Sequence, residues 1–539
     1  MATIAGDASY QERSLFVRKA TGLVRGWSVH DAFIYATFSI NLITLGLYIF
    51  ASSPFIPKGS LLVAIILSGA YLCFQTIVYA ALIAVMPRAG GDYVWVSRVI
   101  GGGIGFVLAV CGWWFINWHW VPIYANILSK EFFQPLGAAF GWPGFVSFFN
   151  ESKGIFVASV ITAFLAAFFI SIGMRGYAKL QKICFYGGML GLLIIFGLLI
   201  FHSKSAFHGA FNHYAQHTYG STSPDAYAAT LKKGTYAGAG SLGGLAFGST
   251  ILLVPMIAFF NLWSNWGATL YGEVRGASDF RKNIYAMAGA LIVTTVLAAI
   301  FLLLIAHTMG WNFYNSANNA WWNGTDQLGG VWPYPVTLAT FFVSPWLQVI
   351  VILLMSLWFF GWVGTVFLTA SRVIFATAFD RILPEWAARV DRRGTPYYAI
   401  LIMLGPSLVI AYFYAYNKTF FNWTLDATLV IAVTFVGSTV AAGILPWRKP
   451  EIYNASPIAK YRIAGLPVIT AAAILFLAYL GYCIYKWLSD GVYGSNNHGS
   501  LIYMGCLYGV ALAIYLISWV VRRRQGMDLK MVYNEIPAE

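Results

Sequence analysis

The chain has 539 residues, of which 59% are hydrophobic and only 10% are charged, and its mean hydropathy is +0.70. Soluble domains carry about 25% charged residues, so a soluble fold is excluded, because it could not bury this much apolar surface. The net charge of +14 does not indicate a nucleic-acid partner, since the basic residues form short clusters between apolar runs. We therefore predict one membrane domain in a lipid bilayer, with short tails.

Apolar runs recur along the chain, and each is long enough to cross a bilayer as a helix, which takes about 20 residues. No cleavage site follows a short apolar segment near the N-terminus, so the first span is expected to act as its own insertion signal. The chain contains twelve predicted spans, and because this number is even, both termini are expected on the same side of the membrane. The predicted spans are 27–51, 60–86, 101–129, 154–174, 180–202, 246–272, 284–309, 335–370, 397–416, 424–446, 465–487 and 500–521.

Most of the 33 lysine and arginine residues lie in the tails and loops of one side. Basic loops stay in the cytoplasm, which predicts a cell-membrane protein with both termini cytoplasmic. The expected organisation is a tail over 1–26, a ten-span transport core over 27–446, two further spans within 447–521 and a tail over 522–539.

The loops 203–245 and 310–334 on the other side are rich in Asn, Tyr, Trp, Gly and Ser, and we expect them to cover an outer vestibule. His208, His213 and His217 lie in the first loop, but their spacing matches no zinc site, so a solvated polar loop is the expected reading. The five cysteines all fall inside apolar runs without paired spacing, which predicts core residues and no metal ligands or disulfide.

Four ordered segments follow particular spans. The first, Met86 to Phe106, reads MPRAGGDYVWVSRVIGGGIGF. Pro87 ends a helix there, the adjacent glycines allow a tight turn, and Arg88 and Arg98 are expected to hold the loop at the inner interface. The others are YGEVRGASDFRK from Tyr271, SRVIFATAFDRILPEWAARVDRRGTP from Ser371 and ILPWRKPEIY from 444 to 453.

Together these segments resemble the cytoplasmic motifs of the amino acid-polyamine-organocation superfamily of permeases. The resemblance implies an all-α leucine-transporter fold, in which spans one to five and six to ten form inverted repeats and two helices are added. It also implies that spans one and six are broken near the midplane, with the substrate between the breaks. The implied function is secondary active transport of an amino acid or related small amine, by alternating access and coupled to a proton or sodium ion.

The predicted site begins in span one, at the polar interruption formed by Thr37, Ser39, Ile40 and Asn41. Many members of the superfamily carry Gly-x-Gly at this break, whereas this chain carries Ser-Ile-Asn. Unwound backbone offers N–H groups and helix-end dipoles to a carboxylate, and this chain departs from the superfamily at the glycines of that backbone.

Span six carries the matching interruption, with the site candidates Asn261, Trp263, Ser264 and Asn265. Trp263 stands near a position that the superfamily usually gives to glycine. Two polar breaks in corresponding spans indicate a central substrate site. Hydrogen bonding between membrane helices is the alternative reading of both clusters.

Coupling residues are harder to place. Proton-driven members of the superfamily can carry a lysine in span five, and Gly188 occupies that place here. Hydroxyls on span eight suit a sodium site, with Thr365 and Thr369 as candidates or as packing residues. His119 in span three is ionisable and intramembrane, which marks it as a functional candidate or a hydrogen-bonded structural imidazole.

Other classes fit less well. A haem-copper oxidase subunit needs imidazole ligands inside the bundle, and the eight histidines include no adjacent pair and no His-x-His. A transporter-like sensor or receptor stays open as an alternative. We expect neither an enzyme nor a cofactor or metal, since no phosphate loop or nucleophile motif occurs. The scarcity of buried acids favours a zwitterionic or apolar amino acid over a polycation, and the oligomeric state stays open.

Overall fold

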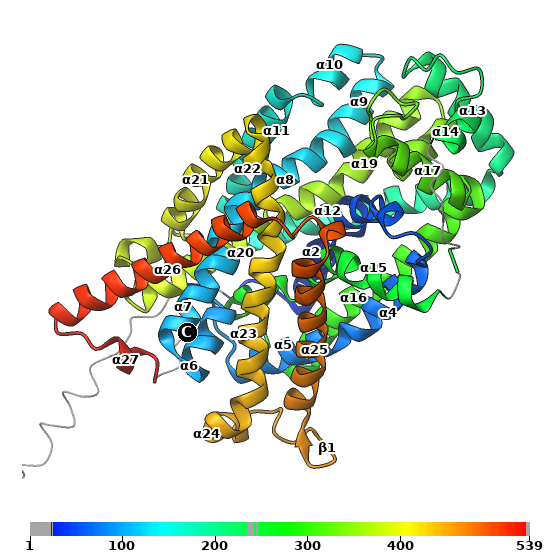
Figure 1. The fold of residues 1–539 in the computed structure, drawn as a ribbon. Helices are drawn as coiled ribbons and strands as arrows, with labels where there is room; N and C mark the ends of the chain where they lie inside the picture. The colour runs from blue at the N-terminus through cyan, green and yellow to red at the C-terminus, as the bar shows by residue number, and fades with distance from the viewer. Residues whose placement is uncertain (1–22, 24, 234–241, 244–245, 535–539) are drawn as a thin grey trace, which may run out of the picture.

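The computed structural model describes residues 23, 25–233, 242–243 and 246–534. Within those residues, twelve helical segments are long and apolar enough to cross a membrane, which confirms the predicted number of spans. The protein is an all-α polytopic membrane protein of the leucine-transporter fold, and its helices form one bundle (Figure 1).

Several spans are built from more than one helical piece. The first five consist of α2 (Val29–Ile40), a π-helical turn (Leu42–Gly46) and α3 (Leu47–Phe50); α4 (Leu61–Tyr71) and α5 (Cys73–Val85); α7 (Gly102–Ala109), α8 (Ile116–Leu128) and α9 (Gln134–Ala139), joined by π-helical segments Val110–Phe115 and Ser129–Phe133; α11 (Ser152–Ser171); and α12 (Gly173–Phe201).

The next five spans also include both broken and continuous helices. They consist of α15 (Phe247–Asn261) with a 3-10 helix (Trp266–Glu273); α16 (Phe280–Thr308); α19 (Pro345–Val363) with α20 (Thr365–Phe379); α21 (Tyr397–Tyr416); and α22 (Lys418–Trp423), a 3-10 turn (Thr424–Asp426) and α23 (Ala427–Arg448). Spans eleven and twelve are α25 (Val468–Ser489) and α26 (His498–Arg524).

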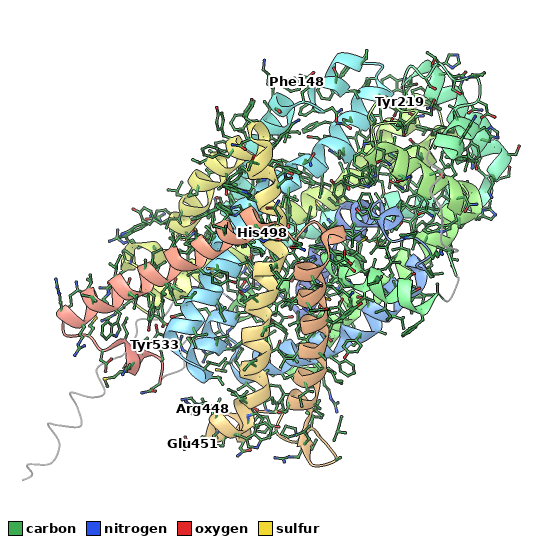
Figure 2. All side chains as sticks on the ribbon, viewed as in Figure 1. Phe148, Tyr219, Arg448, Glu451, His498 and Tyr533 are labelled. Carbon is green, nitrogen blue, oxygen red and sulfur yellow. The ribbon has the colours of Figure 1, made fainter. Side chains whose placement is uncertain are left out.

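The connecting segments fall at two opposite ends of the bundle, and Figure 2 shows Arg448 and Glu451 at one end, with Phe148 and Tyr219 at the other. The basic end carries α6 (Asp92–Val99), α24 (Pro450–Asn454), the hairpin of β1 (Arg462–Ile463) and β2 (Leu466–Pro467), and α27 (Leu529–Val532). The loop end carries α10 (Pro143–Phe148), α13 (Lys204–His217), α14 (Ala226–Lys233), α17 (Trp311–Trp322) and α18 (Pro335–Ala339). Short 3-10 turns also occur in the connecting segments, at Ser53–Phe55, Thr340–Phe342, Glu385–Ala388 and Gly491–Tyr493.

Burial separates central spans from peripheral ones. In the most apolar stretch of span one, 83% of the residues are buried, whereas in the corresponding stretch of span twelve only 11% are buried. Large apolar side chains such as Phe168, Phe201 and Ile502 are exposed on outer helices, as is expected of residues that face lipid. Span one therefore lies at the centre, where a substrate can be enclosed by protein.

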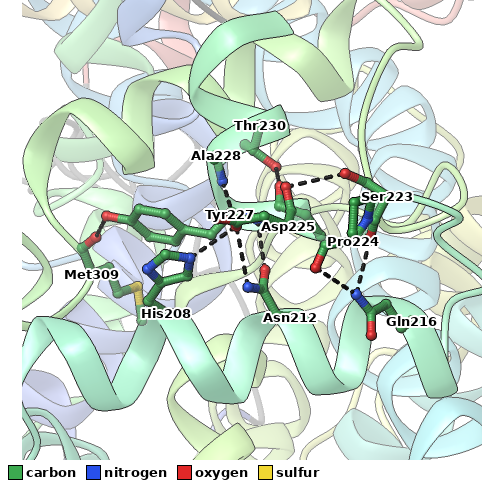
Figure 3. Close-up of polar contacts among 11 residues, drawn as sticks. His208, Asn212, Gln216, Ser223, Pro224, Asp225, Tyr227, Ala228, Thr230 and Met309 are labelled. Carbon is green, nitrogen blue, oxygen red and sulfur yellow. Dashed lines mark hydrogen bonds and ion pairs between the residues drawn. The ribbon is translucent and has the colours of Figure 1, made fainter.

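The loop end is more ordered than its polar composition suggests. The segments expected as covering loops contain α13, α14 and α17, whose aromatic rings pack together, with the Tyr227 and Phe313 centroids 4.4 Å apart. Asp225 precedes α14 and accepts hydrogen bonds from the Ala228 N–H at 2.9 Å and from Asn212 at 3.1 Å (Figure 3). His208 pairs with the same carboxylate at 2.8 Å, and these bonds hold the pKa of Asp225 low, at about 2, the backbone bond most of all.

Candidate substrate site

The break in span one is made by a single asparagine. Asn41 adopts the left-handed conformation with φ 46° and ψ 81°, and this ends α2. Asparagine tolerates this conformation better than other non-glycine residues. Its side chain accepts a hydrogen bond from the Thr44 N–H at 3.1 Å and donates to the Trp358 carbonyl of span eight at 3.2 Å. Asn41 thus produces the interruption that glycines produce in many members of the superfamily.

The other span-one candidates are buried beside this break. Thr37 donates its hydroxyl to the Phe33 carbonyl at 2.9 Å, and Ser39 donates to the Tyr35 carbonyl at 2.8 Å. These bonds run within α2, so the two hydroxyls are already used. Ile40 is fully buried in the core. The hydroxyls are therefore less available to a ligand than the backbone at the break.

The break in span six is filled by a side chain that the sequence analysis missed. Gln75, on α5 of span two, donates to the Leu262 carbonyl at 2.8 Å and to Asn265 Oδ1 at 3.0 Å. Ser264 donates to Gln75 Oε1 at 3.3 Å. The sequence does show a glutamine inside an otherwise apolar span, which was an available signal because buried polar groups in membranes require partners.

Two further span-six candidates lie at this break. Asn261 ends α15 and donates to the Ser68 hydroxyl at 2.9 Å. The Trp263 ring is 5.6 Å from Trp120 of span three and 5.4 Å from Trp266, which is 4.7 Å from Trp113. Four tryptophans thus lie between spans three and six.

Several polar atoms around the breaks are buried without a partner in the described part of the chain. They are the indole N–H of Trp120, Nδ2 of Asn265 and the hydroxyl of Thr365, which begins the second half of span eight. An unsatisfied buried polar group costs about 1–3 kcal/mol. Free donors around the breaks suit a ligand that carries acceptor atoms.

A cavity of about 380 Å³ leads from the loop end towards these tryptophans. Its lining includes Leu45 and Tyr48 past the break in span one, Trp120 of span three, and Met256 and Phe259 of α15. The volume lies within the usual range of small-molecule sites, roughly 300–1,000 Å³. Its largely apolar lining favours a ligand with an apolar side chain.

Two buried ion pairs close the basic end beneath the breaks. Arg372 Nε donates to Glu273 Oε1 at 2.7 Å and Nη2 to Oε2 at 3.1 Å, with both side chains 1% exposed. Arg98 Nη2 lies 2.6 Å from Asp380 Oδ2. Arg98, which was expected to hold the loop at the inner interface, is buried and ties α6 to Asp380 at the end of α20.

Trp27 also joins separate segments of the chain at the basic end. Its N–H donates to the Glu273 carbonyl at 3.2 Å, and its carbonyl accepts from the Arg275 N–H at 2.9 Å. Its indole donates to the Met174 carbonyl at 2.8 Å. The chain preceding span one is thereby tied to the end of span six and to span five.

The coupling candidates occupy different environments. Thr369 donates to the Thr365 carbonyl at 3.1 Å within α20. Both ring nitrogens of His119 are bonded, to the Phe115 carbonyl at 2.9 Å and to the Tyr503 hydroxyl of span twelve at 2.7 Å. At Gly188, a Cβ would lie 2.9 Å from the Trp358 indole nitrogen, which donates to the Gly188 carbonyl. The indole therefore fills the place of a span-five lysine.

No cluster of three or more His, Cys, Asp or Glu side chains suited to a metal ion occurs among the described residues. His208 is instead part of the Asp225 network (Figure 3).

Comparison with known proteins agrees with this architecture. A model of the amino acid permease family matches residues 32–512. The branched-chain amino acid permease BcaP of Lactococcus lactis subsp. cremoris (strain MG1363) is 21% identical over 469 residues, covering 85% of each chain. The Asc-type amino acid transporter 1 of Mus musculus is 25% identical over 433 residues, 77% of this chain and 69% of that one. The Homo sapiens protein of that name is 24% identical over 466 residues, 84% and 75% of the two chains. This chain belongs to the amino acid permease family.

Proposed function

We propose that this protein is a secondary active transporter that moves an amino acid across the cell membrane by alternating access, coupled to an ion. The observation that carries the proposal is the pair of breaks at Asn41 and at Leu262–Asn265, surrounded by buried donors without partners. A carboxylate bound there would accept hydrogen bonds from those donors and from backbone N–H groups at the breaks.

The proposed substrate is a zwitterionic amino acid with an apolar side chain. The cavity wall supports this choice, because Leu45, Met256 and Phe259 offer apolar surface and few charges. One relative is named a branched-chain amino acid permease, which agrees in substrate class. The proposed site combines Asn41 and its neighbours in span one with the span-six residues Asn261 to Asn265.

The proposed cycle has two end states. In the present arrangement the cavity faces the loop end, while the Glu273–Arg372 and Arg98–Asp380 pairs close the basic end. Entry from outside uses the cavity at the loop end, whereas release to the cytoplasm requires these pairs to separate. We place the basic end and both termini in the cytoplasm, in agreement with the positive-inside rule.

Transport by purified protein in liposomes tests this proposal. We expect labelled branched-chain amino acids to exchange against the same unlabelled amino acid inside the vesicle. Asn265→Ala should raise the KM about tenfold, which corresponds to about 1.4 kcal/mol, because it removes polar contacts at the break. Asn283→Ala is the matched control, since Asn283 is also buried but bonds the Ala277 carbonyl at 2.7 Å, away from the breaks.

A folded wild-type protein that binds amino acids without exchanging them would overturn the proposal and favour the sensor or receptor alternative. Equal KM values for the two asparagine variants would remove Asn265 from the proposed site.

A further inference from the structure

One buried carboxylate plays no part in the proposed substrate site. Asp92 is the first residue of α6 and is fully buried between the spans. It follows Gly90 and Gly91, whose positive φ angles of 96° and 41° turn the chain sharply. The turn places an acidic side chain inside the protein instead of at the surface.

The partners of Asp92 are neutral. The Tyr79 hydroxyl of span two donates to Oδ1 at 2.7 Å, and the Ser438 hydroxyl of span ten donates to the same oxygen at 2.6 Å. The Trp113 indole of span three lies beside the carboxyl and favours its charged form. Oδ2 accepts no hydrogen bond from the described residues. The carboxylate is thus buried with one oxygen unsatisfied.

Nearby charges are engaged elsewhere. On α6 itself, Arg98 pairs with Asp380 at the end of α20, and Tyr93 donates to Asp380 at 2.7 Å. Arg372 of α20 pairs with Glu273. Helix α7 carries no titratable side chain, and Ser438 is the group through which α23 bonds Asp92. No cation therefore pairs with Asp92 in the described structure, and burial raises the pKa of its carboxyl to about 6, although the neighbouring donors oppose the rise.

Asp92 is also connected to the break in span six. The Gly90 N–H donates to the Thr269 carbonyl at 2.9 Å, and a Cβ at Gly91 would lie 2.9 Å from the Ala268 carbonyl oxygen. The Trp113 ring is 4.7 Å from Trp266. Asp92 thus lies beside a turn and a tryptophan that both contact the 3-10 helix after the break.

We propose that Asp92 binds the proton that drives uptake: one proton is added to the buried carboxylate in the state that is open to the outside, and it is released to the cytoplasm when the basic end opens. This inference rests on the proposed transport function. Protonation removes an unpaired buried charge and loosens the bonds that Tyr79 and Ser438 make to it. Those bonds join spans two and ten to α6, and the turn that precedes α6 contacts the 3-10 helix of span six. Proton binding therefore changes how firmly that 3-10 helix is held.

Proteoliposomes containing wild type, Asp92→Asn or Asp426→Asn test the proposal. Asp426 is the matched control, because it is a fully buried aspartate at the start of span ten. Each protein is assayed for exchange without a gradient and for accumulation driven by an inward proton gradient or an inward sodium gradient. For Asp92→Asn, we expect the ratio of proton-driven accumulation to exchange to fall about tenfold or more, while Asp426→Asn keeps the wild-type ratio.

Tyr79→Phe provides a second measurement if Asp92→Asn does not fold. It removes a donor that stabilises the charged carboxylate, so the midpoint of the pH dependence of uptake should move to higher pH. An unchanged midpoint contradicts the proposal.

Proton-driven accumulation that survives in folded Asp92→Asn overturns the inference. A wild-type protein whose accumulation responds only to the sodium gradient, or to neither gradient, overturns it as well. Wild type that does not exchange amino acids at all refutes the transport function instead, so the two failures are distinguishable.

Discussion

At the scale of single residues, the best-defined interaction of the basic end is the bidentate pair between Glu273 and Arg372. Both groups are 1% exposed, so neither charge is solvated by water. Such a pair returns little net stability compared with apolar residues, but the loss of one partner leaves an uncompensated charge. In the proposed transport cycle, its role is to specify closure, since the closed end is the arrangement in which both charges are satisfied.

Removal of one partner of the Glu273–Arg372 pair should show the cost of leaving the other charge buried and unpaired. Arg372→Met is expected to destabilise the closed arrangement by about 3–5 kcal/mol, because Glu273 then stays buried and unpaired. The double variant Glu273→Leu, Arg372→Met should recover much of the loss. Thermal unfolding in detergent, followed by the loss of monodisperse protein, measures both. A double variant as unstable as Arg372→Met would contradict the argument.

At the scale of the element, span one is interrupted because its sequence places one left-handed residue between two apolar helices. Asn41 serves this purpose twice, through its backbone angle and through bonds from its side chain to Thr44 and to Trp358. The second bond also fixes the break against span eight.

Two substitutions separate these contributions. Asn41→Gly and Asn41→Ala lose the same side-chain bonds, but only alanine adds the strain of the left-handed conformation, about 1–2 kcal/mol. We expect the melting temperature and the exchange rate to fall in the order wild type, Asn41→Gly, Asn41→Ala. Equal behaviour of the glycine and alanine variants would show that the backbone angle is not required.

At the scale of the whole molecule, the segment from Arg522 to Tyr533 packs onto the basic end. The Tyr533 ring centre lies 5.6 Å from the Arg98 guanidinium and contacts Gly102. Arg522 donates to the Arg381 carbonyl at 2.6 Å. The C-terminal segment thereby contacts the loops that follow spans two and eight, which hold the Arg98–Asp380 pair.

Tyr533→Ala should weaken this contact. The side chain is 8% exposed, and removing a buried aromatic ring costs about 3–5 kcal/mol in a full core, so a smaller loss is expected at this edge. We expect a lower melting temperature and faster modification of a cysteine introduced at Gly101, where an added Cβ would meet no other group within 4 Å. Tyr397→Ala, at a tyrosine that is 39% exposed, is the control and should change neither quantity.

Much of the fold followed from the pattern of the sequence. Twelve spans were predicted, and the described residues contain twelve, because long apolar runs have few stable alternatives in lipid. The polar interruptions of spans one and six were also visible. The closing partners of those breaks were not, because Gln75 and Trp358 come from spans two and eight, and pairing between distant spans leaves no local pattern.

The sequence by itself determined the class of protein, the number of spans and where spans one and six are interrupted, because these depend on local composition and on the need to satisfy the backbone in a bilayer. Only the tertiary structure decided which charges meet. Arg98 pairs with Asp380 and Arg372 with Glu273, whereas Asp92 is buried with neutral partners. The free energy of a buried charge depends on its neighbours in space, and packing alone determines those neighbours.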